Sequence, residues 1–347
     1  MDVTDFDYDL PDELIAQEPA ERGHSRLLLL DRDSGAVEHS TIARLPEHLG
    51  AGDLVVVNDT RVFPARLLGR RVPSGGAVEC LLLSRGDAGT WSALVHPGQK
   101  LRPGARILFE RDGTRLQGEI LARHFHGRRT IRLWSDEGDD IDDAIDRIGH
   151  VPLPPYIVRA DRPSDRQRYQ TVYARVRGSV AAPTAGLHLT EHLLETMRAG
   201  GVGTTAITLH VGYGTFKPVR AARVEDHQVD PEVFEVHDTA ARTIADTRRA
   251  GHRVIAVGTT TTRALESLSL DENGIGAPSC GETRLFIHPG HHFRIVQGLL
   301  TNFHLPRSSL LMLVAAFAGR ERVLAAYREA IREGYRFYSY GDAMLIL

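Results

Sequence analysis

The segment Arg253–Leu268 reads RVIAVGTTTTRALESL, and it decides the fold class that we expect for this chain. Its first part, Arg253–Val257, is a short apolar run typical of a buried strand. Gly258 and four threonines follow, and a helix is predicted to begin among them. A buried strand that leads directly into a helix is the repeating unit of α/β proteins, so we expect a layered sheet-and-helix domain.

The same alternation of strands and helices extends on both sides of this segment. Further strands are expected at Arg26–Asp31, Asp53–Val57, Thr204–Val211, Thr283–Ile287 and Ala343–Leu347. Further helices are expected at Phe6–Glu18, Ser164–Arg175, Thr190–Ala199, Thr239–Ala250, Ser308–Ala318 and Arg320–Glu333. This order predicts an α/β fold in which the sheet is mostly parallel.

Between residues 66 and 134 the pattern changes to short β-type runs separated by turns rich in Gly, Pro and Asp. The runs are Arg66–Val72, Ala77–Leu83, Thr90–Val95, Arg106–Phe109, Arg115–Leu121 and Thr130–Leu133. Short strands at this spacing favour a small β-barrel or sandwich, and we interpret them as an inserted β-barrel domain. The chain would return through an acidic helical stretch, Asp139–Ile148, and an extended proline-rich linker, Val151–Ile157. We therefore expect a discontinuous α/β catalytic domain of residues 1–61 and 151–347 and a barrel domain of residues 62–150.

Composition indicates an ordinary soluble globular protein. The chain has 347 residues, a net charge of −3 and 42% hydrophobic residues. Its acidic first residues lack the apolar run of a signal peptide, and the longest apolar stretch, Leu310–Ala318, is too short to span a membrane. Cys80 and Cys280 form neither a disulfide framework nor a metal-ligand spacing, and His288–His292 (HPGHH) is expected to be a turn rather than a helical metal-binding pair. We expect a cytoplasmic protein without a metal, and the net charge does not single out nucleic acid as a partner.

Four polar loops that contain small residues are predicted at the ends of strands or helices. In Gly258–Arg263, free backbone N–H groups and threonine hydroxyls would suit a carboxylate or a single phosphate; the alternative is a threonine-rich helix start with Arg263 on the surface. Gly178–Thr190 reads GSVAAPTAGLHLT, which fits either a tightly packed loop or a ligand site. Leu209–Phe216 and Thr301–Ser309 complete the set, and a further polar stretch, Ser339–Asp342, lies just before the last strand. Loops at one edge of an α/β sheet line one cleft, so we expect a binding site there.

Several long stretches of the chain are characteristic of one family. They are FDYDLPDELIAQEP from Phe6, LVVVNDTRVFPARL from Leu54, PLPPYI from Pro152, RYQTVYAR from Arg168, the Gly178–Thr190 stretch, LHVGYGTFKPV from Leu209, GTTTTRALES from Gly258, TNFHLPRSSLLMLVAAFAG from Thr301 and YRFYSYGDAML from Tyr335. Together they resemble the S-adenosylmethionine:tRNA ribosyltransferase-isomerases of queuosine biosynthesis over the whole chain.

The resemblance implies an α/β domain with an inserted β-barrel, and an enzyme that transfers and isomerises the ribosyl moiety of S-adenosylmethionine. The acceptor would be 7-aminomethyl-7-deazaguanine at the tRNA wobble position, and the products epoxyqueuosine, adenine and methionine. S-adenosylmethionine would be a substrate, with no other cofactor and no metal. The partners would be this substrate and tRNA, with no membrane, and we expect a monomer.

Such a reaction needs a base for the 5′ proton next to the sulfonium, an anion site for the methionine carboxylate and a surface for adenine. His188 is the first predicted proton-transfer group and Asp59 the second, with Thr184 and His304 as further catalytic residues. Tyr213 or Phe216 would stack on adenine. The predicted substrate-binding residues are Asn58, Arg61, Gly186, Tyr213, Phe216, Thr259, Thr260, Arg263 and Asn302. The predicted tRNA contacts are Arg66, Arg166, Arg168 and Arg175.

The family pattern is interrupted at one polar position. An HxMHxE-like sequence is expected, but His227–Glu232 reads HQVDPE, so Asp230 replaces the second histidine and the role of that position is open. Two other functions compete with the favoured one. An S-adenosylmethionine-dependent RNA methyltransferase would produce S-adenosylhomocysteine, and a non-catalytic RNA-binding protein would bind tRNA without consuming S-adenosylmethionine.

Overall fold

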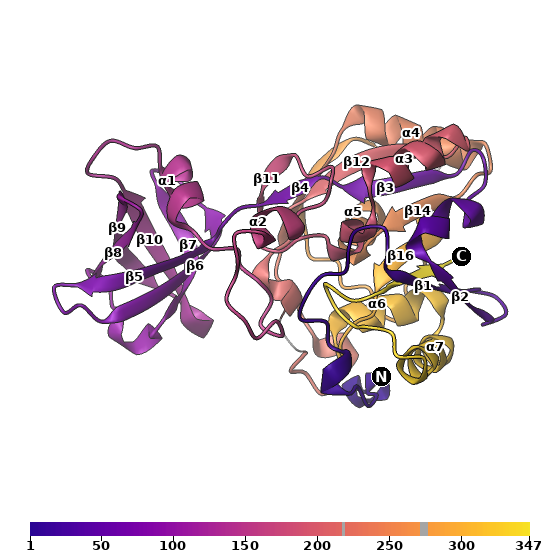
Figure 1. Ribbon diagram of the computed structural model, residues 1–347, viewed down its shortest axis with the longest axis horizontal. Coiled ribbons are helices and arrows are strands. Elements are labelled where there is room, and N and C mark those ends of the chain that lie inside the picture. The colour runs from indigo at the N-terminus through magenta and orange to yellow at the C-terminus, as the bar shows by residue number, and fades with distance from the viewer. Residues whose placement is uncertain (217–218, 271–276) are drawn as a thin grey trace.

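A computed structural model describes residues 1–216, 219–270 and 277–347 of the chain. It contains a nine-stranded sheet with helices on both faces and, at one end of the molecule, a closed six-stranded barrel (Figure 1). The strands of the sheet are, in spatial order, β15 (Ser279–Thr283), β13 (Glu232–Val236), β12 (Gly203–Leu209), β3 (Leu54–Asn58), β14 (Val254–Val257), β16 (Gly298–Asn302), β17 (Ala343–Ile346), β1 (Arg26–Leu30) and β2 (Val37–Thr41). The predicted α/β class with an added barrel is confirmed.

The sheet is mixed, which corrects the expectation that it would be mostly parallel. The central strands β12, β3, β14 and β16 are parallel, and β1 is parallel to β17. The other four neighbouring pairs are antiparallel: β13 with β12, β15 with β13, β17 with β16, and β2 with β1. At one edge the cause is the connection: β13 follows β12 through a loop without a crossover α-helix, so the chain turns back beside itself.

Alternating residues of the central strands build two hydrophobic layers. Val254 and Ala256 of β14 pack in one core with α4 (Asp238–Arg249), α5 (Thr259–Glu266), α6 (Ser309–Ala318) and α7 (Arg320–Arg332). Ile255 and Val257 face the other side and pack with α3 (Glu191–Ala199). Successive side chains of a strand point to opposite faces, so the continuous apolar run of β14 reflects burial on both sides.

The barrel is formed by six antiparallel strands, and all six were predicted. They are β5 (Arg66–Val72), β6 (Ala77–Arg85), β7 (Thr90–His96), β8 (Arg106–Arg111), β9 (Thr114–Arg123) and β10 (Arg128–Trp134). Helix α1 (Ile141–Ile148) adds Ala144, Ile145 and Ile148 to the barrel core. The strand that precedes the barrel, β4 (Thr60–Val62), pairs in parallel with β11 (Val176–Ser179), which follows the barrel and the linker. The domain boundaries at residues 62 and 150 stay a prediction; all barrel strands fall between them.

Three predicted elements are wrong. Phe6–Glu18 is not a helix but contains the 3₁₀ turn η2 (Asp12–Leu14), because its backbone pairs with the chain near Phe337 instead. In Ser164–Arg175 only α2 (Asp165–Arg168) is helical; farther on, the Gln170 side chain bonds both backbone groups of Val62. The predicted strand Thr283–Ile287 ends where β15 (Ser279–Thr283) does, because β15 pairs with β13 through the earlier residues.

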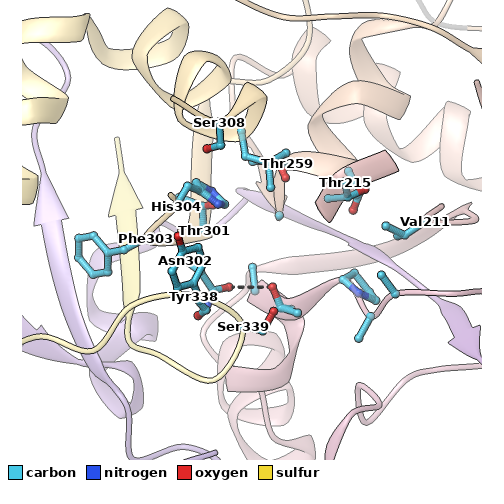
Figure 2. A pocket seen from close by; sticks show the side chains of 18 of the residues that line it. Val211, Thr215, Thr259, Thr301, Asn302, Phe303, His304, Ser308, Tyr338 and Ser339 are labelled. Atoms are coloured by element: carbon cyan, nitrogen blue, oxygen red, sulfur yellow. Dashed lines mark hydrogen bonds between the residues drawn. The ribbon is translucent and has the colours of Figure 1, made fainter. Parts of the chain in front are cut away.

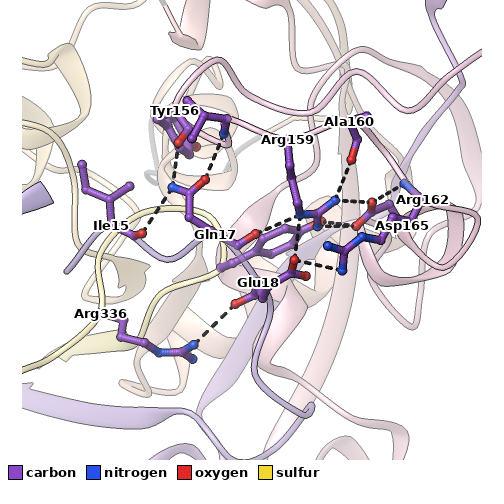
Figure 3. A network of polar contacts seen from close by, with 11 residues as sticks. Ile15, Gln17, Glu18, Tyr156, Arg159, Ala160, Arg162, Asp165 and Arg336 are labelled. Atoms are coloured by element: carbon purple, nitrogen blue, oxygen red, sulfur yellow. Dashed lines mark hydrogen bonds and ion pairs between the residues drawn. The ribbon is translucent and has the colours of Figure 1, made fainter. Parts of the chain in front are cut away.

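A polar network fixes the proline-rich linker against the start of the chain (Figure 3). The Gln17 amide donates to the Tyr156 carbonyl at 2.9 Å and accepts from the Val158 N–H at 2.9 Å. Arg159 pairs with Glu18 at 3.1 Å and with Asp165 at 2.7 Å. The network thereby holds Tyr156 at the edge of the site described next. No helix in the described part of the chain is both long and apolar enough to cross a membrane.

Candidate active site

A cleft lies at the carboxyl ends of the central parallel strands (Figure 2). Counted to its open mouth, its volume is about 690 Å³. It is lined by residues that follow β12, β14 and β16, by the Ala181–Ala185 loop and by aromatic side chains of two distant segments. The lining residues used below are Tyr156, Thr184, Thr259, Thr260, Thr301, Asn302, His304, Ser308, Tyr338 and Ser339. Three of the four predicted loops thus contribute most of one cleft, and Leu209–Phe216 adds Val211 and Thr215.

One wall is the start of α5. Gly258 has φ +92°, a backbone conformation that favours glycine, and this allows the strand to turn directly into the helix. Thr261 and Thr262 donate to the Val257 and Gly258 carbonyls and so face the helix itself. Thr259 and Thr260 line the cleft, where the positive end of the helix dipole and their hydroxyls favour electron-rich ligand atoms.

Asn302, at the end of β16, is oriented by a chain of hydrogen bonds. Its amide N–H groups donate to the Tyr338 carbonyl at 2.9 Å and to His188 Nε2 at 3.1 Å. Its Oδ1 accepts from the Thr184 hydroxyl at 3.3 Å. Both donors of the amide are therefore used, and its oxygen is turned toward Thr184 and the cleft.

His188 lies behind the cleft lining rather than in it. It is 4% exposed, and because Nε2 accepts from Asn302, Nδ1 carries the proton and donates to Ser25 Oγ at 2.9 Å. Burial, with a smaller contribution from Arg336, lowers the pKa of His188 to about 4. In this arrangement His188 is a neutral imidazole that orients Asn302.

His304 lines the cleft itself. Its Nε2 lies 2.8 Å from the Thr301 hydroxyl, its backbone N–H donates to Tyr327, and its carbonyl accepts from Tyr8. Burial lowers the pKa of His304 to about 3, so the ring is neutral at physiological pH. It is the histidine that the structure brings to the cleft surface.

Two tyrosines that the sequence analysis did not single out form the aromatic wall. Tyr156 and Tyr338 stack with ring centroids 4.4 Å apart, and the Tyr156 hydroxyl lies 2.5 Å from Ser339 Oγ. Tyr338 has φ +72° and a buried hydroxyl without a hydrogen-bond partner among the described residues. Burial raises the pKa of both tyrosines, so they stay protonated. Non-glycine residues with positive φ cluster at functional sites. In the sequence, the only signal for these two tyrosines is that they belong to the family-typical stretches PLPPYI and YRFYSYGDAML.

The described lining of the cleft is mostly apolar, carries a few hydroxyl and amide groups, and is uncharged. Among its described lining residues none is Asp, Glu, Lys or Arg, and His304 is neutral. The hydroxyl and amide groups can bind a heterocycle or sugar, and the tyrosine faces can lie against a cation.

Other predicted site residues support this region from behind. The Asn58 side chain bonds the backbone N–H and C=O of Leu209 and reaches Thr260 Oγ1 at 3.4 Å. The Asp59 carboxylate accepts from Thr208 at 2.6 Å and from Arg175 at 2.8 Å. Neither lines the cleft. Gly186 is also behind it, where a Cβ would lie 2.1 Å from the Tyr173 hydroxyl, so only glycine fits.

Three further predicted residues lie elsewhere or cannot be placed fully. Arg61 is exposed on β4. Tyr213 lies in a separate interdomain groove beside the barrel, which also contains Arg66. The side chain of Phe216 lies outside the described part of the structure.

Arg263 faces a second, smaller pocket that shares Thr215 and Leu310 with the cleft. It forms an ion pair with Glu232 and donates from Nε to the Leu285 carbonyl at 2.8 Å. Asp230, the departure from the family pattern, lines the same pocket and pairs with Arg128 of the barrel strand β10 at 2.8 Å. We call this the side pocket.

The predicted tRNA-contacting arginines all have protein partners. Arg66 pairs with Glu79 at 2.8 Å, and Arg166 donates to the Asp146 and Gly149 carbonyls at 2.6 Å each. Arg168 donates to the Ala20 carbonyl, and Arg175 pairs with Asp59 while its side chain is 70% exposed. In the described ranges, no group of three or more His, Cys, Asp or Glu side chains is arranged to hold a metal ion.

Comparison with known proteins gives one consistent result. A model of the family described as "Queuosine biosynthesis protein" matches residues 3–346. The chain is 49% identical to a protein of Halothermothrix orenii and 51% identical to one of Heliobacterium modesticaldum, both named S-adenosylmethionine:tRNA ribosyltransferase-isomerase and each covered completely in both directions. It is also similar to a crystal structure of S-adenosylmethionine tRNA ribosyltransferase from Thermotoga maritima, with 38% identity, a TM-score of 0.56, and coverage of 99% of this chain and 100% of the other.

Proposed function

The chain belongs to the queuosine biosynthesis protein family, and from this premise we propose that it is a tRNA-modifying enzyme, an S-adenosylmethionine:tRNA ribosyltransferase-isomerase. It transfers and isomerises the ribosyl moiety of S-adenosylmethionine onto 7-aminomethyl-7-deazaguanine at the wobble position of tRNA. The products are epoxyqueuosine, adenine and methionine. The observation that carries the proposal is that family-typical loops form one uncharged cleft at the carboxyl ends of the parallel strands.

The cleft is the site at which S-adenosylmethionine binds. The sulfonium lies against the stacked Tyr156 and Tyr338 rings, whose faces attract a cation. The hydroxyls of Thr259 and Thr260 and the Asn302–Thr184 pair supply hydrogen bonds to the nucleoside. A lining without formal charge avoids repelling the sulfonium.

His304 is the base that removes the 5′ proton, because it lines the cleft and is neutral. A proton acceptor must be unprotonated, and burial, which lowers the pKa of His304, keeps the imidazole in that form while also making it a weaker base. The positive sulfonium makes the adjacent carbon acidic, so the proton passes from this carbon to the ring. His188, which the sequence analysis favoured, positions Asn302 instead, and Asp59 holds Arg175 and Thr208.

Departure of adenine requires a hydrogen-bond donor, and the Tyr338 hydroxyl is suited to this role. It is buried, lacks a partner among the described residues and keeps its proton because burial raises its pKa. The unprotonated aminomethyl group of the tRNA base then forms the new C–N bond to the ribosyl fragment and loses a proton, and methionine leaves when its C–S bond to that fragment breaks.

The tRNA is bound through arginines near the barrel and the linker. Of the predicted residues, Arg175 and Arg166 are the most accessible, and Arg66 lies in the groove between the barrel and the linker. Phosphate contacts by arginines make tRNA affinity salt-dependent. We further propose that the enzyme acts as a cytoplasmic monomer and uses no cofactor or metal beyond S-adenosylmethionine as substrate.

One incubation tests the proposal. The protein is mixed with S-adenosylmethionine and tRNA that carries the precursor base, and small molecules and nucleoside mass are analysed. We expect adenine, methionine and the mass of epoxyqueuosine. S-adenosylhomocysteine would indicate a methyltransferase, and unchanged S-adenosylmethionine with bound tRNA would indicate a binding protein; either result rejects the proposal.

The assignment of the base has its own test. His304→Gln should lower kcat about 10²-fold or more, whereas the matched variant His188→Gln should lower it less, because His188 acts only through Asn302. A larger loss in His188→Gln than in His304→Gln, with both variants folded, would reverse the assignment.

A further inference from the structure

The uncharged cleft leaves one part of the proposed substrate without a matching group. S-adenosylmethionine ends in an α-amino acid with a carboxylate and an ammonium, and burying either charge requires a partner. The described cleft lining has no charged side chain. Apart from the start of α5, a charged partner for the zwitterionic end must therefore be sought outside this lining.

The side pocket contains the missing charges. It borders the cleft through Thr215 and Leu310, and Arg263 and Asp230 are among its lining residues. The aminocarboxypropyl chain of S-adenosylmethionine is a short flexible arm of the kind that can reach from a cleft into a neighbouring pocket.

Arg263 has one donor that no residue in the described ranges uses. It is 9% exposed; its Nε bonds the Leu285 carbonyl and one terminal nitrogen pairs with Glu232. The other terminal nitrogen is buried without a hydrogen-bond partner in the described part of the protein. An unsatisfied buried guanidinium nitrogen is costly, and a carboxylate is the group that satisfies it best.

Glu232 fixes the direction of this donor. Its second carboxylate oxygen accepts from the Gly212 N–H at 2.9 Å and from the Thr215 hydroxyl at 3.4 Å. Because Glu232 and the Leu285 carbonyl hold two sides of the guanidinium, its third nitrogen cannot turn away. Thr215 connects this clamp to the cleft, which it also lines.

We propose that the side pocket is the subsite for the methionine end of S-adenosylmethionine and that the unpartnered nitrogen of Arg263 binds its α-carboxylate. This inference rests on the proposed function. It places the carboxylate beside Arg263 in the side pocket and not at the start of α5 in the cleft. Asp230 on the same lining already pairs with Arg128, so the inference rests on Arg263. Arg263 is then a specificity residue for a substrate that retains its carboxylate.

The test compares S-adenosylmethionine with its decarboxylated analogue, which keeps the adenosine, the sulfonium and the amine. Calorimetric Kd values are measured for the wild type and for the double variant Arg263→Gln/Glu232→Gln. The double variant is used because removing Arg263 alone would leave the buried Glu232 charge uncompensated. The wild type should prefer S-adenosylmethionine by about 10- to 100-fold, and the double variant by less than about 3-fold.

Two results would overturn the inference: a wild type that binds both ligands within about 3-fold, or a double variant that keeps the wild-type preference. Thermal unfolding verifies that the double variant is folded. If it is not, Arg263→Lys replaces it, since a lysine keeps the charge opposite Glu232 but lacks the second donor arm. Failure of the proposed function looks different, because no adenine would then be released from S-adenosylmethionine, whatever the two Kd values are.

Discussion

The two buried neutral histidines make a quantitative prediction about stability and pH. Burial lowers the pKa of His188 to about 4 and that of His304 to about 3, from an ordinary value of 6.5. In the unfolded chain both rings take up protons as the pH falls below about 6.5, while in the folded protein they do not. The unfolded state therefore binds more protons, and stability falls as the pH is lowered from 6.5 toward these native values.

The size of the effect follows from the pH interval. Each histidine removes about 1.4 kcal/mol of stability per pH unit between the unfolded and folded pKa values. From pH 7 to pH 5 this amounts to about 2 kcal/mol for each ring and about 4 kcal/mol for both. The result does not depend on how far below 5 the native pKa values lie. A loss of this size is a large fraction of the stability of an ordinary domain.

Urea denaturation at pH 7 and pH 5 measures the effect in the wild type and in the single variants His188→Gln and His304→Gln. Glutamine cannot take up the proton, so each variant should lose about 2 kcal/mol less stability than the wild type between pH 7 and pH 5. The difference in free energy of unfolding between wild type and variant should shrink by this amount. His24→Gln is the matched control, because that side chain is 69% exposed and its replacement should change stability by less than about 0.5 kcal/mol at both pH values. A gap that stays constant for His188→Gln would refute the reasoning that this ring is neutral and buried.

Three other substitutions give separate expectations. Gly258→Ala should lower the free energy of unfolding by about 1–2 kcal/mol in urea denaturation, because its φ of +92° is unfavourable for alanine. Space is not the cause, since the Ala185 Cβ, the nearest atom to an added Cβ, is 3.6 Å away. An unchanged value would show that the strand-to-helix turn adapts. Arg128→Ala should cost less than about 1 kcal/mol in the same measurement, since the Arg128 and Asp230 side chains are 37% and 32% exposed, and a loss above about 2 kcal/mol would contradict this. Tyr338→Phe should keep thermal stability within about 1 kcal/mol but lower the rate of adenine release about 10-fold or more, because its hydroxyl has no described protein partner; full activity would remove the hydroxyl from the mechanism.

Local sequence patterns predicted those elements whose structure depends mainly on nearby residues. The six barrel strands alternate in burial and end at Gly, Pro or Asp turns, so their positions are visible in the sequence. The β14–α5 unit is equally local, because Gly258 permits the turn and the strand before it is apolar throughout. Elements such as β13 and β16 were not predicted, since pairing with distant strands decides them.

The candidate site shows the same division. The loops that line the cleft were recognisable, but the roles of individual residues were not. His188 and His304 each lie close before a predicted helix, and only the tertiary neighbours Ser25 and Asn302 distinguish the buried ring from the one at the surface of the cleft. Arg263 was grouped with Thr259 in one anion-binding stretch, or alternatively placed on the surface, yet it is buried and faces another pocket. Helical spacing predicts a face, but which neighbour covers that face depends on the whole fold.

The absence of charge in the described cleft lining has a chemical consequence for the proposed reaction. A carboxylate beside the sulfonium would bind it more tightly, but it would also offset the positive charge that makes the neighbouring 5′ carbon acidic. A lining of hydroxyls, an amide and tyrosine rings holds the cation without neutralising it. The neutral state of His304 serves the same end, since a protonated imidazole would both repel the sulfonium and be unable to accept the proton. Placing the charged groups Arg263, Glu232 and Asp230 in the side pocket keeps them at the amino-acid end, where they contribute to binding without weakening the acidity on which the first step depends.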